Sequence, residues 1–308
     1  MKKIKYILGI FLAGIALSAC QSEETTDFPD YSKNWFELQD NPSDSVDHAM
    51  YQFYQDYNIP VFANDTIGSQ QRIDVFGKEY THYEKLTLSY SMGGGLSANS
   101  SPVVTINTFA TRKNIPAFLR FLRENVMPAV PKGIHIHSIL LVDKMTSQAF
   151  GNDAFKGLNT LVLSNVSDLP DIDDNQKKAI RGSILRMLYS DYITNSEDYT
   201  SQLEKFYNVS RALCVEKDIY NMYTGYLRYY VSGADPSNWG HPTVQEVGFL
   251  NADPTNSYYT PSSPFMDVMM YCEAILTYSE NEFKEQYGQY PYIMEKYNIL
   301  KEILNTIR

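Results

Sequence analysis

The clearest pattern of hydrophobic and polar positions lies in the middle of the chain, over residues 174–193. Ile180, Ile184, Met187 and Leu188 recur there at i, i+4, i+7 and i+8. This spacing puts the four side chains on one face of an α-helix. The pattern predicts an amphipathic helix that buries one apolar stripe.

In the first half of the chain the pattern mostly changes to the alternation that is typical of strands. Leu86, Leu88 and Tyr90 alternate with polar residues, so that successive side chains point to opposite faces of a sheet. The sequence predicts strands over 73–92, 103–109, 134–142 and 158–163, and a further strand after Pro60. It also predicts two helices in this half: one is capped by Ser43 or Asp44 and runs to Tyr57, and the other covers 114–130.

Beyond Asp171 the same analysis predicts mainly helices. They cover 174–193, 198–215, 217–231, 264–279 and 291–307. Residues 232–262 are rich in Pro, Gly, Asn and Ser, and an irregular connection of this length usually has a binding or functional role. We therefore expect an α+β fold, in which a small mixed sheet from the N-terminal half packs with a mostly helical C-terminal half.

The first twenty residues have the features of an export signal. Three lysines precede an apolar run that is too short to span a bilayer comfortably, and the run ends in Leu17-Ser18-Ala19-Cys20. This ending resembles a bacterial lipobox, whose cysteine is lipidated and becomes the first residue of the mature protein. We expect a lipoprotein signal peptide over 1–19, an acidic flexible tether over 20–43 and a single domain over 44–308.

The residues after Cys20 and the overall charge narrow the expected location. Gln21-Ser22-Glu23-Glu24 resembles the short acidic signal with which Bacteroidota export lipoproteins to the outer face of the outer membrane. It implies a lipid-anchored protein that faces the cell exterior. The formal charge is -10, and no basic cluster follows the export signal, so we do not expect nucleic acid as a partner.

The remaining cysteines and a pair of histidines are candidates for chemistry. Cys214 and Cys272 either pair in an oxidising compartment or stay as buried free thiols. His135 and His137 lie two residues apart, so they share one face of the predicted strand and are spaced to bind a metal. We favour the polar face of an edge strand, because no further ligands lie nearby in the sequence.

A series of short motifs marks the C-terminal part of the chain. The motifs are Gly248-Phe249-Leu250, Ser262-Ser263-Pro264-Phe265-Met266-Asp267-Val268, Glu282-Phe283 and Tyr292-Ile293-Met294-Glu295-Lys296-Tyr297, and an earlier helix-to-strand step is Tyr57-Asn58-Ile59-Pro60-Val61. Together they resemble the zinc-binding metallopeptidase lipoproteins that are found beside SusC/SusD-type outer-membrane importers. The resemblance runs, with gaps, from about residue 44 to the end, and it implies a zincin-like fold.

Members of this family bind zinc with His-Glu-x-x-His on the central helix and with a downstream acid. Two histidines four residues apart reach one ion from one helix face, and the glutamate acts as base on the metal-bound water. In this chain the motif falls on Gly182, Ser183 and Arg186, and no histidine lies between His137 and His241. Arg186 carries a permanent cation, which cannot ligate zinc.

The region of the downstream acid also departs from the family pattern. Asp267 remains, but Met266 and Met270 stand where the family carries acids. We interpret Asp267 as a partner of the helix N-terminus, and we expect neither a metal nor another cofactor. A replacement metal site, built from His241 or from the histidine pair described above, remains the alternative.

The sequence therefore predicts an inactive relative of zinc metallopeptidases rather than an enzyme. The expected role is accessory: to bind a peptide or glycan, or to dock on a SusC/SusD-like importer. The cleft is expected between helices 174–193 and 264–279, with Trp239, Tyr258 and Tyr259 as a stacking surface at its rim. The alternatives are an active zinc peptidase with unconventional ligands and a purely structural subunit of the importer.

Overall fold

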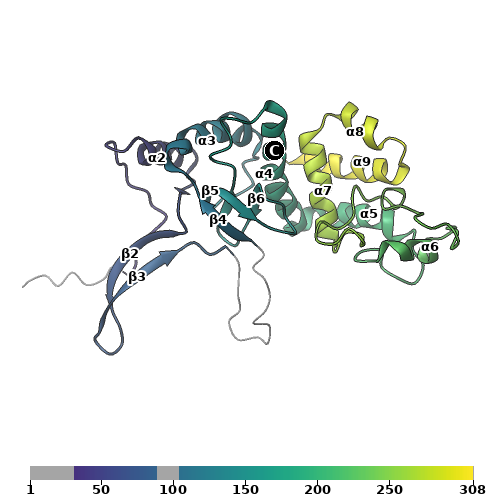
Figure 1. Cartoon of the computed structure of the whole chain (residues 1–308), viewed down its shortest axis with the longest axis horizontal. Helices are drawn as coiled ribbons and strands as arrows, with labels where there is room; N and C mark the ends of the chain where they lie inside the picture. The colour runs from purple at the N-terminus through teal and green to yellow at the C-terminus, as the bar shows by residue number, and fades with distance from the viewer. Residues whose placement is uncertain (1–30, 89–103, 308) are drawn as a thin grey trace, which may run out of the picture. The chain divides into compact units, whose positions relative to one another are not determined.

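The computed structural model describes residues 31–88 and 104–307 (Figure 1). Within these ranges the chain forms two compact units. The first contains residues 31–35 and 68–84, and the second contains residues 36–67 and everything from residue 85 onward. The predicted lipidation site, Cys20, lies outside the described residues. The single domain expected over 44–308 stays a prediction, and residues 68–84 within it group with the first unit.

The first unit is built on a β-hairpin. Its strands are β2 (Thr66–Ile73) and β3 (Glu79–Lys85). The turn between them is closed by the Asp74 carboxylate, which accepts hydrogen bonds from the backbone N–H groups of Phe76 and Lys78. The prediction of one strand over 73–92 is thus wrong. The sequence Asp74 to Lys78 has the chemistry of a turn, with Gly77 at a φ of +81°, and the second strand ends at Lys85.

The second unit contains a small mixed sheet. Its strands are β1 (Val61–Phe62), β4 (Thr105–Phe109), β5 (Ile139–Thr146), β6 (Ala154–Lys156) and β7 (Leu161–Leu163). The order is β1-β5-β7-β6, and β4 pairs with β5. β5 runs parallel to β1 and β7 and antiparallel to β4, while β6 and β7 are antiparallel. Ile139, Leu140, Leu141 and Val142 are all buried, as expected for a strand covered on both faces.

Two strand predictions in this region need correction. The strand expected over 134–142 begins at Ile139, so His135 and His137 precede it. The strand expected over 158–163 begins only at Leu161, as β7, and the sequence did not predict its antiparallel partner β6. Apolar runs of this length do not by themselves define where a strand begins.

The helices lie mainly in the second half of the chain, which confirms the α+β prediction. They are α2 (Ser45–Tyr57), α3 (Ile115–Phe121), α4 (Asp174–Asn195), α5 (Thr200–Arg211), α6 (Leu227–Tyr230), α7 (Pro264–Thr277), α8 (Glu280–Tyr287) and α9 (Pro291–Thr306). α3 continues as a π-helical turn over Leu122–Val126 and a 3-10 turn over Met127–Ala129. None of the described helices is long and apolar enough to cross a membrane.

The helix predictions fail in two places. The helix expected over 217–231 shrinks to a 3-10 turn and the four residues of α6. The helix α8 was not predicted, although its start carries a clear signal. Ser279 and Glu282 form a capping box there, in which the side chain of each accepts from the backbone N–H of the other.

The helix α4 is the central element of the second unit. It packs against β6 on one side and against α7 on the other (Figure 1). Its start is fixed by a capping box between Asp173 and Gln176. The residues of the polar face, Gly182, Ser183 and Arg186, are as buried as the apolar stripe. The expectation of a one-sided amphipathic helix is therefore wrong, because α7 covers the second face.

Gly182 sets the distance between α4 and α7. A Cβ atom at this position would overlap the hydroxyl oxygen of Thr277 at the end of α7. With the Thr277 hydroxyl in its present orientation, this approach of the helices requires a residue without a side chain at position 182.

This contact yields a prediction for stability. Gly182→Ala improves helix propensity by about 1 kcal/mol, but we expect it to lower the free energy of unfolding by about 1–3 kcal/mol through overpacking. In a Thr277→Ala background the overlap disappears, and the same substitution should then be neutral or stabilising. Urea unfolding of the four proteins tests this, and a stabilising Gly182→Ala in the unmodified chain would contradict the close approach.

Candidate functional site

A polar network joins α4 to α7 at the position of the expected metal-binding motif. Arg186 donates through Nη1 to the Glu273 carboxylate and through Nη2 to the Phe150 carbonyl. The Ser183 hydroxyl lies 3.1 Å from both Glu273 Oε1 and Asp153 Oδ2. We call these five residues the α4–α7 network. It links two helices to the segment that leads into β6.

The local sequence explains why these groups meet. Ser183 and Arg186 are three residues apart and therefore lie on the same face of α4. Glu273 faces them from α7, because Gly182 lets the two helices approach. Asp153 is held in turn by the side-chain amide of Asn165, which donates to its carboxylate over 2.9 Å. The carboxylates of Glu273 and Asp153 thus both bind hydrogen-bond donors of the protein.

These residues do not fit a zinc ion. A zinc site needs three protein ligands, and the network offers two carboxylates that already bind a guanidinium and a hydroxyl. Among residues 31–88 and 104–307, no three or more His, Cys, Asp or Glu side chains lie close enough together to share a metal ion. The cation at this position is supplied by Arg186.

The histidines of the alternative metal site lie apart. His135 and His137 are exposed, with ring centroids 6.1 Å apart, and the ring of His137 packs on Phe36. His241 instead places Nδ1 2.9 Å from Glu246 Oε2. The structure does not bring His241 together with the pair.

Asp267 occupies a different site from the rest of the predicted motif. It lies in the first turn of α7, as expected, but its carboxylate does not serve only the helix end. Oδ2 accepts from Lys296 Nζ at 2.6 Å and from the Tyr220 hydroxyl at 2.7 Å. The interpretation of Asp267 as a simple partner of the helix N-terminus therefore needs correction, because its main partner is a buried ammonium.

The Asp267–Lys296 pair is enclosed by aromatic rings. Lys296 Nζ lies 4.4 Å from the ring centroid of Phe249 and 4.9 Å from that of Phe206. Burial raises the pKa of Asp267 and lowers the pKa of Lys296, because desolvation disfavours both charged forms. The pair is thus a structural tie between α7 and α9 that is costly to break.

A cavity of about 270 Å³ opens beside the α4–α7 network. Ala179 of α4 and Glu273 of α7 line it, and Leu250 and Asn251 of the 232–262 connection complete the wall. It therefore lies between the two helices where the sequence predicts a cleft. The predicted stacking residues Trp239, Tyr258 and Tyr259 are not among its lining residues.

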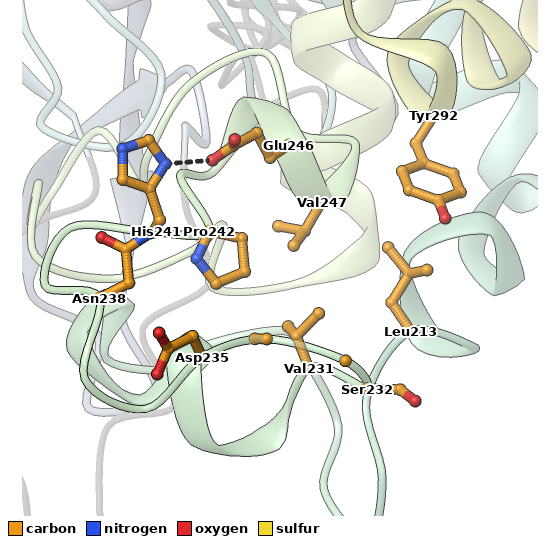
Figure 2. Close-up of a pocket in the computed structure, with 12 residues that line it drawn as sticks. Leu213, Val231, Ser232, Asp235, Asn238, His241, Pro242, Glu246, Val247 and Tyr292 are labelled. Carbon is orange, nitrogen blue, oxygen red and sulfur yellow. Dashed lines mark hydrogen bonds and ion pairs between the residues drawn. The ribbon is translucent and has the colours of Figure 1, made fainter.

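A second cavity, of about 440 Å³, lies under the 232–262 connection. Asn238, His241 and Glu246 lie on one side of it, and Leu213 and Tyr292 on the other (Figure 2). The backbone N–H of Thr243 and the His241 ring lower the pKa of Glu246, so this side of the cavity is polar and charged.

The predicted stacking residues lie in the connection, each with its own partner. The Trp239 ring covers the guanidinium of Arg228, whose Cζ lies 3.3 Å from the ring centroid. Tyr259 packs edge-on against Tyr223, and the Tyr258 side chain is exposed. They are surface residues of the connection rather than the rim of the α4–α7 cavity.

The two cysteines are free thiols. Burial raises the pKa of Cys214 to about 11 and also raises the pKa of the fully buried Cys272. Neither thiol has the lowered pKa that a nucleophile requires.

Sequence reasoning missed three charged residues that matter in these sites. Glu273 lies on a helix that is otherwise nearly apolar, and Lys296 lies among the buried positions of α9. A charged residue at a buried helical position needs a partner, so both patterns contained a usable signal. Arg228 gave no such signal, because the sequence around it predicted a long helix of which only the four residues of α6 form.

Comparisons of the chain with protein-family models, with curated proteins and with solved structures find no match. The resemblance to metallopeptidase lipoproteins therefore stays a prediction from the sequence motifs. The structure establishes the coarser α+β fold with its small mixed sheet.

The buried pair gives a second prediction. Lys296→Met leaves the Asp267 carboxylate buried and unpaired, which should cost about 3–5 kcal/mol of unfolding free energy. Replacing both partners, with Asp267→Leu and Lys296→Met, should recover all but about 1 kcal/mol, the cost of the stranded Tyr220 hydroxyl. Chemical denaturation of the single and double variants measures this, and losses that simply add would contradict the pairing.

Proposed function

We propose that this protein is a non-catalytic relative of zinc metallopeptidases that acts as an accessory binding lipoprotein on the outer membrane. In this proposal the fold is zincin-like, and α4 corresponds to the helix that carries His-Glu-x-x-His in active members. The protein binds a ligand or docks on a SusC/SusD-like importer, and it faces the cell exterior on a lipid attached to Cys20.

One observation carries the proposal. At the motif positions of α4, Ser183 and Arg186 bind the acid of α7, Glu273, directly. A metal ion normally joins ligands from such elements and activates a water. Here the guanidinium of Arg186 joins α4 to α7, and a guanidinium cannot coordinate and activate a water molecule.

The binding role draws support from the rest of the second unit. Two cavities remain open beside α4–α7 and under the 232–262 connection. Several large aromatic side chains of residues 223–258 are exposed, among them Tyr226, Trp239 and Tyr258. Exposed aromatic rings with polar groups close by are typical of recognition surfaces.

Zinc content tests the proposal. The full-length chain, purified in detergent, should contain far less than one zinc per protein by elemental analysis. Ser183→His with Arg186→His should create a zinc site, because the two introduced imidazoles share a helix face with Glu273 opposite them. Zinc should then raise the melting temperature of the variant and leave that of the unmodified protein unchanged.

The opposite outcome is equally clear. Stoichiometric zinc in the unmodified protein that is lost with His241→Ala or His135→Ala would contradict the proposal and favour an active peptidase with unconventional ligands. Co-purification with an importer, without affinity for any soluble ligand, would favour a purely structural subunit.

A further inference from the structure

Arg228 is a buried cation without an anion. Its side chain belongs to α6, and the residue is 6% exposed. Nη2 donates to the Tyr229 hydroxyl over 2.7 Å, but Nε and Nη1 have no hydrogen-bond partner. No carboxylate of the described residues lies within ion-pair distance of its guanidinium. Buried cations are normally paired, since an unpaired one is costly.

The contrast with Arg211 shows what is missing. Arg211 also stacks on aromatic rings, those of Tyr207 and Tyr220. It is more exposed, yet it faces two carboxylates, from Glu204 and Asp218, at 3.7 and 3.4 Å. The more buried of the two arginines is thus the one that lacks an acid.

Two aromatic rings lie against the guanidinium of Arg228. Its Cζ lies 3.3 Å from the centroid of the Trp239 ring and 4.6 Å from that of Tyr229. Trp239 is 78% exposed, so little besides this stack holds the indole in place. We call these three residues the Arg228 stack. A modest movement of the indole would uncover a cation, and the face of the indole that points away from Arg228 is open.

A second group of aromatic side chains lies on the same segment of the chain. Tyr226 packs edge-on against Tyr223 and Tyr230, and Tyr223 packs against Tyr259. Tyr223 and Tyr226 are both exposed. Tyrosine combines an apolar ring face with a hydroxyl, so it can stack on the C–H face of a sugar ring and hydrogen-bond to its hydroxyl groups.

We propose that the Arg228 stack binds an acidic saccharide, in which the carboxylate of a uronic-acid unit pairs with Arg228 and the pyranose rings lie on Trp239 and its neighbouring tyrosines. This inference deepens the binding role proposed above and rests on it. The ligand supplies the anion that Arg228 lacks, and a charge-assisted hydrogen bond to a guanidinium is the stronger kind.

Two common modes of peptide binding have no counterpart in this surface. Extended peptides add to a sheet edge, and helical peptides lie in an apolar groove, whereas the 223–259 region forms isolated bridges and short turns. An acidic segment can still pair with an arginine, so an acidic peptide is the competing ligand in the test. The cavity of Figure 2 adjoins this region along the chain, because Asn238 and His241 flank Trp239 closely. Its polar side offers hydrogen-bonding groups to sugar hydroxyls.

The two tryptophans of the chain make the test direct. Trp35 lies in the first unit and Trp239 in the second. Trp35→Phe therefore leaves Trp239 as the sole indole, and its fluorescence reports on the Arg228 stack. The full-length Trp35→Phe protein is titrated with an oligogalacturonate in chelator-containing buffer. The matched ligand is the same oligosaccharide with its carboxylates methyl-esterified, and an acidic peptide, oligoglutamate, is the third.

The proposal predicts a saturable change in Trp239 fluorescence with oligogalacturonate. Esterification of the ligand and Arg228→Met should each weaken binding by about tenfold or more, whereas Arg211→Met should leave it unchanged. Equal binding of the acid and ester forms, no saturable binding of oligogalacturonate, or binding of oligoglutamate at least as tight would each overturn it.

The comparison of acid and ester ligands uses the Trp35→Phe protein alone, so it remains decisive even if Arg228→Met fails to fold. The result is also separable from the zinc measurement. A chain without zinc that ignores the oligogalacturonate keeps its non-catalytic assignment and loses only this site.

Discussion

The contact between Arg186 and Glu273 is the constraint on which the second unit depends most. It lies where α4 meets α7, and α4 also packs against β6 of the sheet (Figure 1). The contact depends on the absence of a side chain at Gly182. It also depends on the Glu273 and Asp153 carboxylates, which both bind groups of the protein. A metal ion joins two helices by accepting lone pairs from their ligand side chains. A guanidinium instead joins them by donating hydrogen bonds. In this chain the second kind of link joins α4 to α7.

Three buried cations illustrate how the partner of a charge decides its role. Arg186 and Lys296 each face a carboxylate, and each ties α7 to a second helix. Arg228 has no acid and is covered by an indole that is mostly exposed. Arg186 and Lys296 thus form internal ion pairs, while the guanidinium of Arg228 has no counter-charge among the described residues. We therefore assign a structural role to the α4–α7 network and propose a ligand-binding role for the Arg228 stack.

The sequence predicted those elements whose signals are local. The stripe of α4 and the cap of α2 by Asp44 are both visible as short patterns, and they mark helices that the structure contains. The predicted motif positions include Ser183 and Arg186, and in the structure both of these contact Glu273 of α7. Elsewhere a local signal was misread. The 217–231 segment contains Asn221, Thr224 and Gly225, which are poor helix formers, and most of it forms turns that hold the tyrosines and Arg228.

The partners of the site residues could not be derived from one sequence. The ion pair of Arg186 spans 87 positions and that of Lys296 spans 29, and no spacing rule connects residues so far apart. Asp267 was grouped with the α4 motif because of a family resemblance, and the structure gives it to Lys296 instead. The sequence does indicate that a charged residue on an otherwise apolar helix needs a partner.

The most direct test of the central claim is the coupling energy between Arg186 and Glu273. It follows from the unfolding free energies of Arg186→Met, Glu273→Gln, the double variant and the unmodified chain. If the guanidinium and the carboxylate hold α4 and α7 together, the two substitutions should couple by about 2 kcal/mol, as expected for a charge-assisted contact that is largely buried. Effects that add to within about 0.5 kcal/mol would show that this contact does not hold the two helices together.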